Sequence, residues 1–247
     1  MNIVSTLRIK NEEKCILRCL ESISQISSHI LIFDDHSNDS TEIICKKFRD
    51  DKFKNLHYYK SPFDETTDEV RDKNKLLEIT LKYATENTWV LAIDGDEELE
   101  KKSQDKLPEL LNKLSKFKPD PLVFVQFLYL WDRTDQYRAD GIYGKFFQPR
   151  IWRVPKDRSD LKFVKNTAKM GFHCGSVPYM LPIIPYRNTA IKFLHYGYLE
   201  EETRIMKYIY YNLSDPSNTY EDFYRHIINT TGGCKYTPEP IELKDIK

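Results

Sequence analysis

Short apolar runs alternate with stretches of helical periodicity along the chain. The apolar runs predict strands at 3–9, 30–33, 56–59, 89–93, 122–129 and 191–194. Apolar residues at helical spacing predict helices over 12–26, 41–48, 71–84, 107–114, 199–213 and 220–228. This alternation is typical of a parallel sheet flanked by helices, so we expect an α/β fold. Residues 131–186 show little period and are too long for a plain loop, so short strands are expected there.

Polar residues mark where the first two helices should begin. Asn11 is expected to cap the first helix, with Glu12 and Glu13 in its positively polarised first turn. Asp39 or Ser40 is expected to cap the second helix.

Composition narrows the classes of protein that fit. The 247 residues can bury the core of one large domain. Lys and Arg number 38 and Asp and Glu number 38, and this zero net charge argues against a nucleic-acid partner. The longest apolar stretch, 122–131, is too short to span a bilayer. The first residues lack the pattern of a signal peptide, so we expect a cytoplasmic protein.

The strongest chemical feature is Asp94-Gly95-Asp96, directly after the apolar strand 89–93. Charged residues that end a buried strand lie at its carboxyl edge, where open α/β sheets bind ligands. Two carboxylates on either side of a glycine can turn toward one hard cation. Such a cation would bridge to a diphosphate and neutralise charge on a leaving group. A solvated acidic turn is the alternative interpretation.

Asp34 and Asp35 end the second predicted strand, at the same sheet edge as Asp94 if the strands are parallel. A carboxylate there can accept hydrogen bonds from the imide or amino edge of a nucleobase. Capping of the next helix needs only Asp39 or Ser40, so this pair is available for binding.

Five segments carry a family resemblance by their order and spacing. They are 4–13, 20–23, 33–41, Arg71 with Asn74, and 89–97. Together they resemble a family 2 glycosyltransferase of GT-A fold, and the match thins beyond Asp96. The resemblance implies an α/β fold, a GT-A-like single domain with a mostly parallel central sheet, helices on both faces and a C-terminal helical tail. It divides the chain into a nucleotide-sugar-binding half, 1–98, an acceptor-binding half, 99–198, and the tail, 199–247.

The resemblance also implies which residues hold the donor. In the family, the loop that follows the first strand holds the nucleotide base, and Lys10 lies in that loop here. Arg71 matches the basic residue near the donor pyrophosphate, and Lys75 is the second candidate for that contact. An ion pair with Asp68 or Asp72 would instead give Arg71 a structural role. The implied nucleotide-sugar-binding residues are Thr6, Arg8, Asn11, Asp35, Arg71 and Asp94.

A divalent cation is part of what the resemblance implies. Asp96 matches a direct ligand of Mn²⁺ or Mg²⁺. Many enzymes of this fold add a histidine from late in the chain, and His195, which closes the strand 191–194, is in a suitable place. A neutral imidazole suits Mn²⁺ better than Mg²⁺.

An acceptor hydroxyl needs a general base, because an alcohol is a poor nucleophile until its proton leaves. Members of the family commonly supply Asp or Glu from the second half of the chain. Here His173 is followed by Cys174, where a carboxylate is expected. Arg150 is a candidate contact to a phosphate or the acceptor. The candidates for the base are His173, Asp132, Asp135 and Asp140.

The implied function is inverting, metal-dependent transfer of a sugar from a nucleotide-diphosphate donor to a hydroxyl of a glycan, a lipid-linked saccharide or a protein. Two alternatives stay open. The missing carboxylate at Cys174 motivates a catalytically inactive sugar-nucleotide-binding protein, and D-x-D at a strand end is also used by haloacid-dehalogenase phosphatases. Peripheral contact with a membrane and self-association also stay open.

Overall fold

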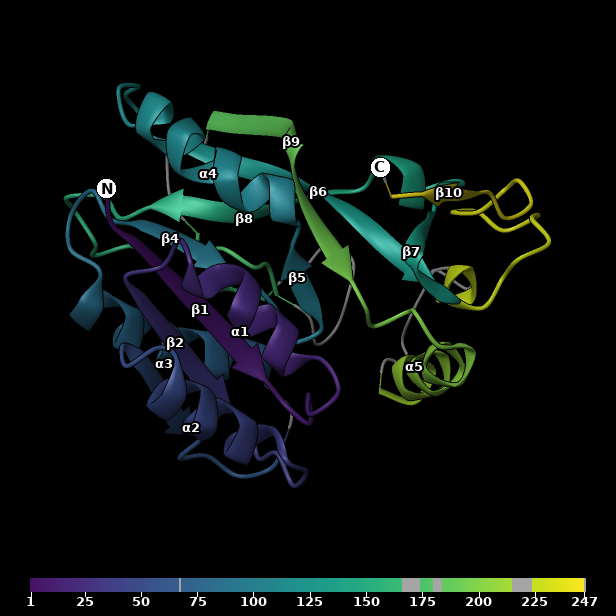
Figure 1. The fold of residues 1–247 in the computed structure, drawn as a ribbon, viewed down its shortest axis with the longest axis horizontal. Coiled ribbons are helices and arrows are strands. Elements are labelled where there is room, and N and C mark those ends of the chain that lie inside the picture. The colour runs from purple at the N-terminus through teal and green to yellow at the C-terminus, as the bar shows by residue number, and fades with distance from the viewer. Residues whose placement is uncertain (67, 166–173, 180–183, 215–223, 247) are drawn as a thin grey trace.

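One large sheet organises the molecule (Figure 1). The computed structural model describes residues 1–66, 68–165, 174–179, 184–214 and 224–246. Across these residues the strand order is β10-β7-β6-β8-β4-β1-β2-β3, with β9 beside β6 and β5 beside β9. The predicted α/β fold is confirmed.

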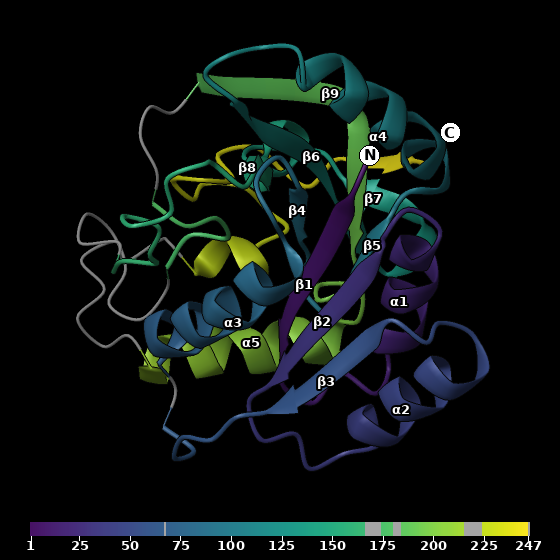
Figure 2. The ribbon, with the colours of Figure 1, turned by 90° about the vertical axis from the view of Figure 1, so that its left-hand side faces the viewer.

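The N-terminal half contributes four strands that pair with one another in parallel. Its strands are β1 (Ile3–Ile9), β2 (His29–Asp34), β3 (Leu56–Lys60) and β4 (Trp89–Ala92). Its helices are α1 (Ile16–Ser24), α2 (Thr41–Asp51) and α3 (Glu69–Tyr83). β1 pairs in parallel with β2 and β4, and β2 pairs in parallel with β3. Figure 2 shows α1 and α2 on one face of these strands and α3 on the other.

Helices on both faces explain why β4 is apolar throughout. In β4, Trp89 and Leu91 pack into the core beneath α1, whereas Val90 packs into the core beneath α3. Alternate side chains of a strand point to opposite faces, so a strand covered on both sides buries every residue. The central position predicted for this strand is confirmed by its pairing with β1 on one side and β8 on the other.

The second half extends the sheet with mainly antiparallel pairs. Its elements are β5 (Glu97–Leu99), α4 (Lys101–Leu114), β6 (Pro121–Trp131), β7 (Arg133–Arg138), a 3₁₀ helix (Tyr143–Lys145), β8 (Phe147–Arg153), β9 (Ile184–His195), α5 (Glu201–Ser214), a 3₁₀ helix (Arg225–Ile227) and β10 (Leu243–Asp245). β7 and β8 are the short strands expected between 131 and 186. Among the described helices, none combines the length and apolarity that crossing a membrane requires.

The start of α1 differs from the prediction. The helix begins at Ile16, and Asn11 does not cap it. Asn11 instead adopts φ 55°, a left-handed conformation that asparagine tolerates, and its side-chain oxygen accepts the N–H of Asn38 at 2.8 Å. The N-cap position of α2 is Ser40, one of the two residues predicted, but its side chain makes no capping hydrogen bond. The carboxylate of Asp39, one residue earlier, accepts the N–H of Thr41 at 3.0 Å.

The C-terminal tail is only partly helical. α5 confirms the helix predicted over 199–213, but of the helix predicted over 220–228 the described part holds one 3₁₀ turn. The chain then returns to the sheet, where β10 pairs antiparallel with β7. An edge strand offers unpaired backbone groups, and β10 satisfies those of β7.

A buried ion pair ties the end of β7 to this returning segment. The guanidinium of Arg138 binds both carboxylate oxygens of Asp140, at 2.8 and 2.9 Å, and both side chains are essentially inaccessible. Arg138 also donates to the carbonyls of His226 and Asn229. One oxygen of Asp140 accepts the N–H of Glu242 as well. Every group of this pair is therefore engaged in holding the fold.

Replacing Arg138 by methionine should leave Asp140 buried without a counter-charge and lower the free energy of unfolding by about 3–5 kcal/mol. Arg133→Met is the matched control, because Arg133 pairs with Asp135 on the same strand but in solvent. That change should leave stability nearly unchanged. Urea unfolding followed by circular dichroism measures both, and equal losses would contradict the structural role of the buried pair.

Candidate active site

The carboxyl ends of β1, β2 and β4 meet at one edge of the sheet, as the sequence predicted. In the register, Ile9 lies beside Asp34, and the N–H of Ile93 donates to the carbonyl of Thr6. The loops that follow these strands therefore bring the exit loop of β1, the Asp34-Asp35 pair and the D-x-D loop to the same place. This edge is where open α/β sheets bind ligands.

Arg8 and Asp35, both predicted donor-site residues, form one buried cluster. Arg8 Nη2 lies 2.7 Å from Asp35 Oδ2 and 2.8 Å from Asp72 Oδ2, and both carboxylates are almost inaccessible. Asp35 Oδ1 is also buried, yet it has no hydrogen-bond partner in the described part of the chain. A buried acceptor without a partner is costly, so this oxygen is suited to accept a hydrogen bond from a ligand.

The neighbouring polar residues have structural partners. Asp34 accepts hydrogen bonds from the hydroxyls of Ser37 and Tyr58, so of the Asp34-Asp35 pair only Asp35 keeps a free oxygen. Thr6 lies in β1 between β2 and β4. Asn11 links the exit loop of β1 to the loop before α2. The structure therefore brings these two predicted residues to the edge without showing their roles toward a ligand.

Arg71 forms an ion pair with Asp72, one of the two pairs expected if its role is structural. Its Nε lies 3.0 Å from Asp72 Oδ1 and its Nη1 lies 2.8 Å from Asp64 Oδ1. Lys75 pairs with Glu78 in solvent. The contact of Arg71 with a pyrophosphate stays a prediction.

Lys73, which the sequence reasoning missed, faces the site from α3. Its ammonium reaches the carbonyl oxygens of Cys174 and Gly175 at 3.4 and 3.3 Å, and it helps to lower the pKa of Asp94. The N–H of Cys174 donates to Glu69 on the same helix. Cys174, the residue that follows His173, is thus anchored to α3, the helix that carries Asp72.

Arg150 supports the D-x-D loop from β8. Its Nη2 binds Asp94 Oδ2 at 2.8 Å and also binds Glu97 Oε1. Burial raises the pKa of Glu97, whereas for Asp94 partial burial is outweighed by Arg150, which lowers the pKa. Asp94 therefore stays ionised, with its side chain 47% exposed, whereas Arg150, at 3% exposure, contacts the loop from the protein interior.

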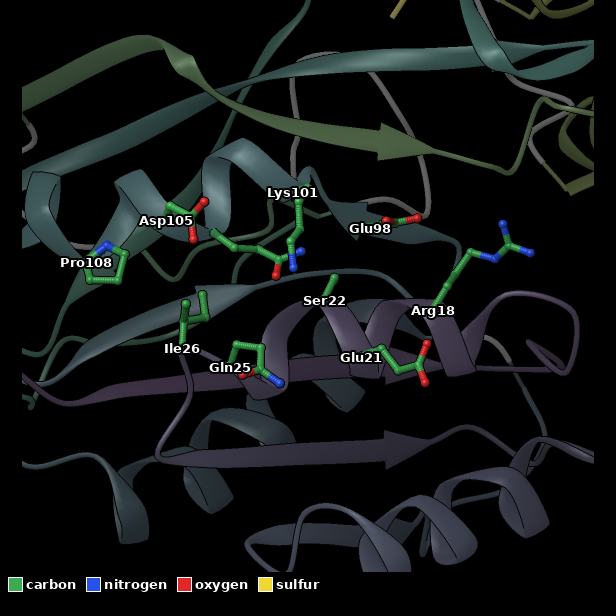
Figure 3. Close-up of a pocket in the computed structure, with 10 residues that line it drawn as sticks. Arg18, Glu21, Ser22, Gln25, Ile26, Glu98, Lys101, Asp105 and Pro108 are labelled. Atoms are coloured by element: carbon green, nitrogen blue, oxygen red, sulfur yellow. The ribbon is translucent and has the colours of Figure 1, made fainter. Parts of the chain in front are cut away.

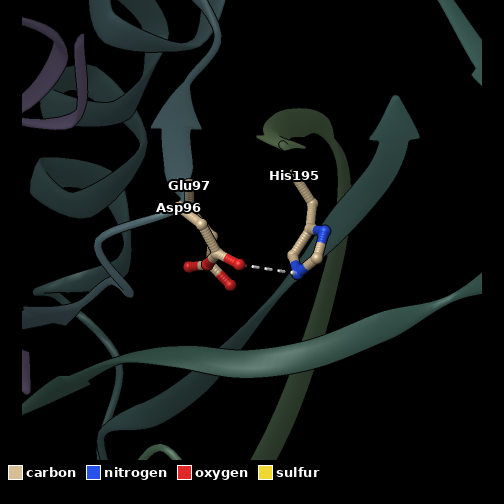
Figure 4. A group of neighbouring side chains, drawn as sticks. All are labelled: Asp96, Glu97 and His195. Atoms are coloured by element: carbon tan, nitrogen blue, oxygen red, sulfur yellow. Dashed lines mark ion pairs between the residues drawn. The ribbon is translucent and has the colours of Figure 1, made fainter. Parts of the chain in front are cut away.

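Asp96 faces His195, as Figure 4 shows. In the antiparallel pairing of β5 with β9, Glu97 lies opposite His195, the last residue of β9. Asp96 precedes Glu97 and therefore lies next to this end of β9. Asp96 Oδ2 is 3.6 Å from His195 Nε2, too long for a hydrogen bond, and 2.9 Å from Lys207 Nζ. Burial lowers the pKa of His195 to about 4, so its ring is neutral and able to bind a cation.

These residues fit a divalent cation through two ligands. Ligand atoms of Asp96, Glu97 and His195 lie within 4.8 Å of one another. Glu97 is already engaged on both oxygens, by Arg150 and by the N–H of Asp94. Asp96 and His195 would therefore hold the ion, as predicted, and hard cations complete such sites with water and phosphate oxygens.

Glu12 is a further site residue that the sequence reasoning placed in a helix. A side chain on Gly95 would meet Glu12 Cγ at 2.6 Å, so the glycine of D-x-D is what allows Glu12 to lie against this loop. Burial raises the pKa of Glu12 to about 9, with Asp96 and Asp94 adding to the effect. The one feature of the sequence that could have indicated a site role for Glu12 is its position in the exit loop of β1.

The candidates for the general base lie in different places. Asp132 binds Arg204 at 2.7 Å, Asp135 pairs with Arg133 in solvent, and both oxygens of Asp140 bind Arg138. His173 lies outside the described residues.

A separate cavity of about 570 Å³ opens between α1 and α4, away from this cluster (Figure 3). Its lining is mostly charged or polar, with Arg18, Glu21, Lys101 and Asp105 at its walls. Glu98 also faces it, although the hydroxyl of Tyr196 already donates to that carboxylate. None of the predicted donor or metal residues lines this cavity, so the cavity is separate from the site at the sheet edge.

Comparison with known proteins agrees with this geometry. The family model for glycosyl transferase family 2 matches residues 8–180. The chain belongs to glycosyl transferase family 2. The prediction of a glycosyltransferase is thereby confirmed at the level of the family. No curated protein matches this family 2 chain in sequence.

Solved structures of TarS from S. aureus resemble the fold of this family 2 chain. One TarS structure is 14% identical, with a TM-score of 0.51 over 85% of this chain. TarS residues 1–349 in complex with UDP-GlcNAc are 15% identical, with a TM-score of 0.52 over 92% of this chain. The chain spans 39% of the first structure and 70% of the second. At such identities the likeness shows the GT-A fold alone.

Glu12→Gln should stabilise the protein at neutral and alkaline pH. The native state keeps the Glu12 proton, whereas the unfolded chain releases it above a pKa of 4.5, so native stability falls as pH rises from about 4.5 to about 9. Between pH 5 and 8 the wild-type protein should lose about 1–3 kcal/mol relative to the variant. Urea unfolding in EDTA measures this difference.

The matched control for that experiment is Glu86→Gln, which removes an exposed carboxylate before β4. It should shift stability equally at both pH values. A Glu12→Gln curve parallel to that of the wild type would show that Glu12 ionises normally in the native state.

Proposed function

We propose that this chain transfers a sugar from a nucleotide-diphosphate donor to an acceptor hydroxyl, with a divalent cation and with inversion at the anomeric carbon. The observation that carries the proposal is the pairing, at one sheet edge, of a buried free acceptor on Asp35 with the Asp96–His195 pair. The first suits a nucleobase and the second a cation on the diphosphate.

Asp35 is suited to recognise the base because Arg8 fixes the orientation of its carboxylate. Arg8 holds Oδ2 at 2.7 Å, which leaves Oδ1 to accept an imide or amino N–H. Arg8 is itself shared with Asp72, so turning it away would leave Asp35 with Lys10 alone, at 4.0 Å, and Asp72 with Arg71 alone. TarS was solved with UDP-GlcNAc, so a UDP-sugar is the first donor to test.

The cation would be held by Asp96 and His195. When bound, such an ion neutralises charge that develops on the diphosphate leaving group. The neutral imidazole of His195 favours Mn²⁺ over Mg²⁺. Asp94, held by Arg150 and half exposed, faces the donor as the first carboxylate of the motif.

The general base is best sought at His173. Arginines hold Asp132 and Asp140, whereas the chain next to His173 is tied by Glu69 and Lys73 to the helix that carries Asp72. A base there would take the acceptor proton as the hydroxyl oxygen attacks the anomeric carbon and the nucleotide diphosphate leaves. A single attack of this kind inverts the anomeric configuration.

The division into a donor half, 1–98, an acceptor half, 99–198, and a tail from 199 is part of the same proposal. The proposed acceptor is a molecule with a nucleophilic hydroxyl: a glycan, a lipid-linked saccharide or a protein. A phosphatase is disfavoured by the family match and by the place of D-x-D after β4 rather than β1.

One nucleoside diphosphate among UDP, GDP, CDP and dTDP should raise the melting temperature in Mn²⁺ by about 5–10 °C at 100 times its Kd. The shift should shrink in EDTA. In Asp96→Ala the EDTA and Mn²⁺ shifts should become equal, and in Asp35→Asn both should fall. Differential scanning fluorimetry measures these shifts.

Asp135→Ala is the control and should behave as the wild type, because Asp135 is exposed and pairs with Arg133 in solvent. If no nucleotide shifts the wild-type melting temperature with any metal, the donor-site assignment is wrong. If a nucleotide binds but its sugar donor is neither transferred nor hydrolysed, the protein is a sugar-nucleotide-binding protein rather than an enzyme.

A further inference from the structure

Lys207 on α5 occupies the side of Asp96 that faces His195. Its ammonium lies 2.9 Å from Asp96 Oδ2, the same oxygen that faces His195 Nε2 at 3.6 Å. A side chain on Gly197 would meet Asp96 Oδ2 at 2.2 Å, Lys207 Nζ at 2.3 Å and His195 Cε1 at 2.7 Å. All three groups therefore crowd around one small space above Gly197.

The helix that carries Lys207 is anchored one turn earlier. Arg204 donates to the carbonyls of Tyr198 and Leu199 and to Asp132, which fixes the start of α5 against the end of β9 and β6. Residues three apart lie on the same face of a helix, so Lys207 is directed to the same side as Arg204. The Lys207 ammonium also lies over the ring of Tyr198, at 5.4 Å.

An ammonium and a divalent cation cannot both use this oxygen at contact distance. They repel each other, and the low exposure of Asp96, 13%, and of Lys207, 28%, reduces solvent screening. A cation held by Asp96 and His195 would therefore have to displace Lys207 from Asp96.

We propose that Lys207 is a positioning residue that competes with the divalent cation for Asp96 and pairs with the donor's diphosphate once the cation has displaced it. This inference rests on the proposed function. Without a donor, the ammonium neutralises Asp96 and weakens metal binding. With a donor, the diphosphate supplies a new anionic partner for Lys207, so cation and nucleotide bind with positive coupling through this side chain.

The test is the affinity of the whole chain for Mn²⁺, measured from the free-ion signal in electron paramagnetic resonance, with and without the nucleotide that binds best. Without nucleotide, Lys207→Met should bind Mn²⁺ about tenfold or more tightly than the wild type. Lys207→Arg keeps the charge and should bind as the wild type does. Nucleotide should tighten Mn²⁺ binding by a smaller factor in Lys207→Met than in the wild type.

Lys14→Met is the matched control, because Lys14 is exposed and pairs with Glu200 just before α5. It removes the same charge from the same region and should leave Mn²⁺ affinity unchanged. Melting curves establish that each variant is folded, and Lys207→Gln replaces Lys207→Met if the latter is not.

Equal or weaker Mn²⁺ binding by the neutral Lys207 variants would overturn this inference and leave the proposed function standing. Absence of Mn²⁺ binding by every protein, with and without nucleotide, would overturn both the inference and the metal dependence of the proposed function.

Discussion

The site depends on neutralising carboxylates that gather at the carboxyl edge of β4. Glu97 is nearly inaccessible, Asp96 is mostly buried, and Asp94 and Glu12 lie beside them. A buried carboxylate without a counter-charge is costly, so each of these groups needs a cation, a proton or a hydrogen-bond donor. The two cations that form ion pairs with the D-x-D carboxylates come from the second half of the chain, Arg150 from β8 and Lys207 from α5. The D-x-D loop therefore depends on the second half of the chain for the charges that balance its carboxylates.

The same principle separates structural from ligand-facing groups. Asp140 and Glu97 have both oxygens engaged by protein donors and hold elements together. Within the described part of the chain, one buried oxygen of Asp35 has no protein partner, which marks Asp35 as a binding group, because native proteins seldom leave buried acceptors unused. Asp96 is instead held by the ammonium of Lys207 at 2.9 Å.

The sequence predicted what depends on local pattern. Apolar runs located the strands of the parallel half, and the abrupt end of the fourth run located Asp94 and Asp96 at the ligand edge. It did not predict what depends on pairs far apart in the chain, such as Asp94 with Arg150 or Asp96 with Lys207. Asn11 resembled a helix cap locally, but its contact with Asn38 across the loop determined the structure instead.

The two clusters of the site also differ in when they can form as the chain is synthesised. The cluster of Arg8, Asp35 and Asp72 draws all its members from the first 72 residues, so they are synthesised before the D-x-D loop. Asp96 gains His195 and Lys207 only about a hundred residues later. In a growing chain, all members of the Arg8 cluster are therefore present well before the Asp96 cluster can be complete, because Lys207 comes only with α5.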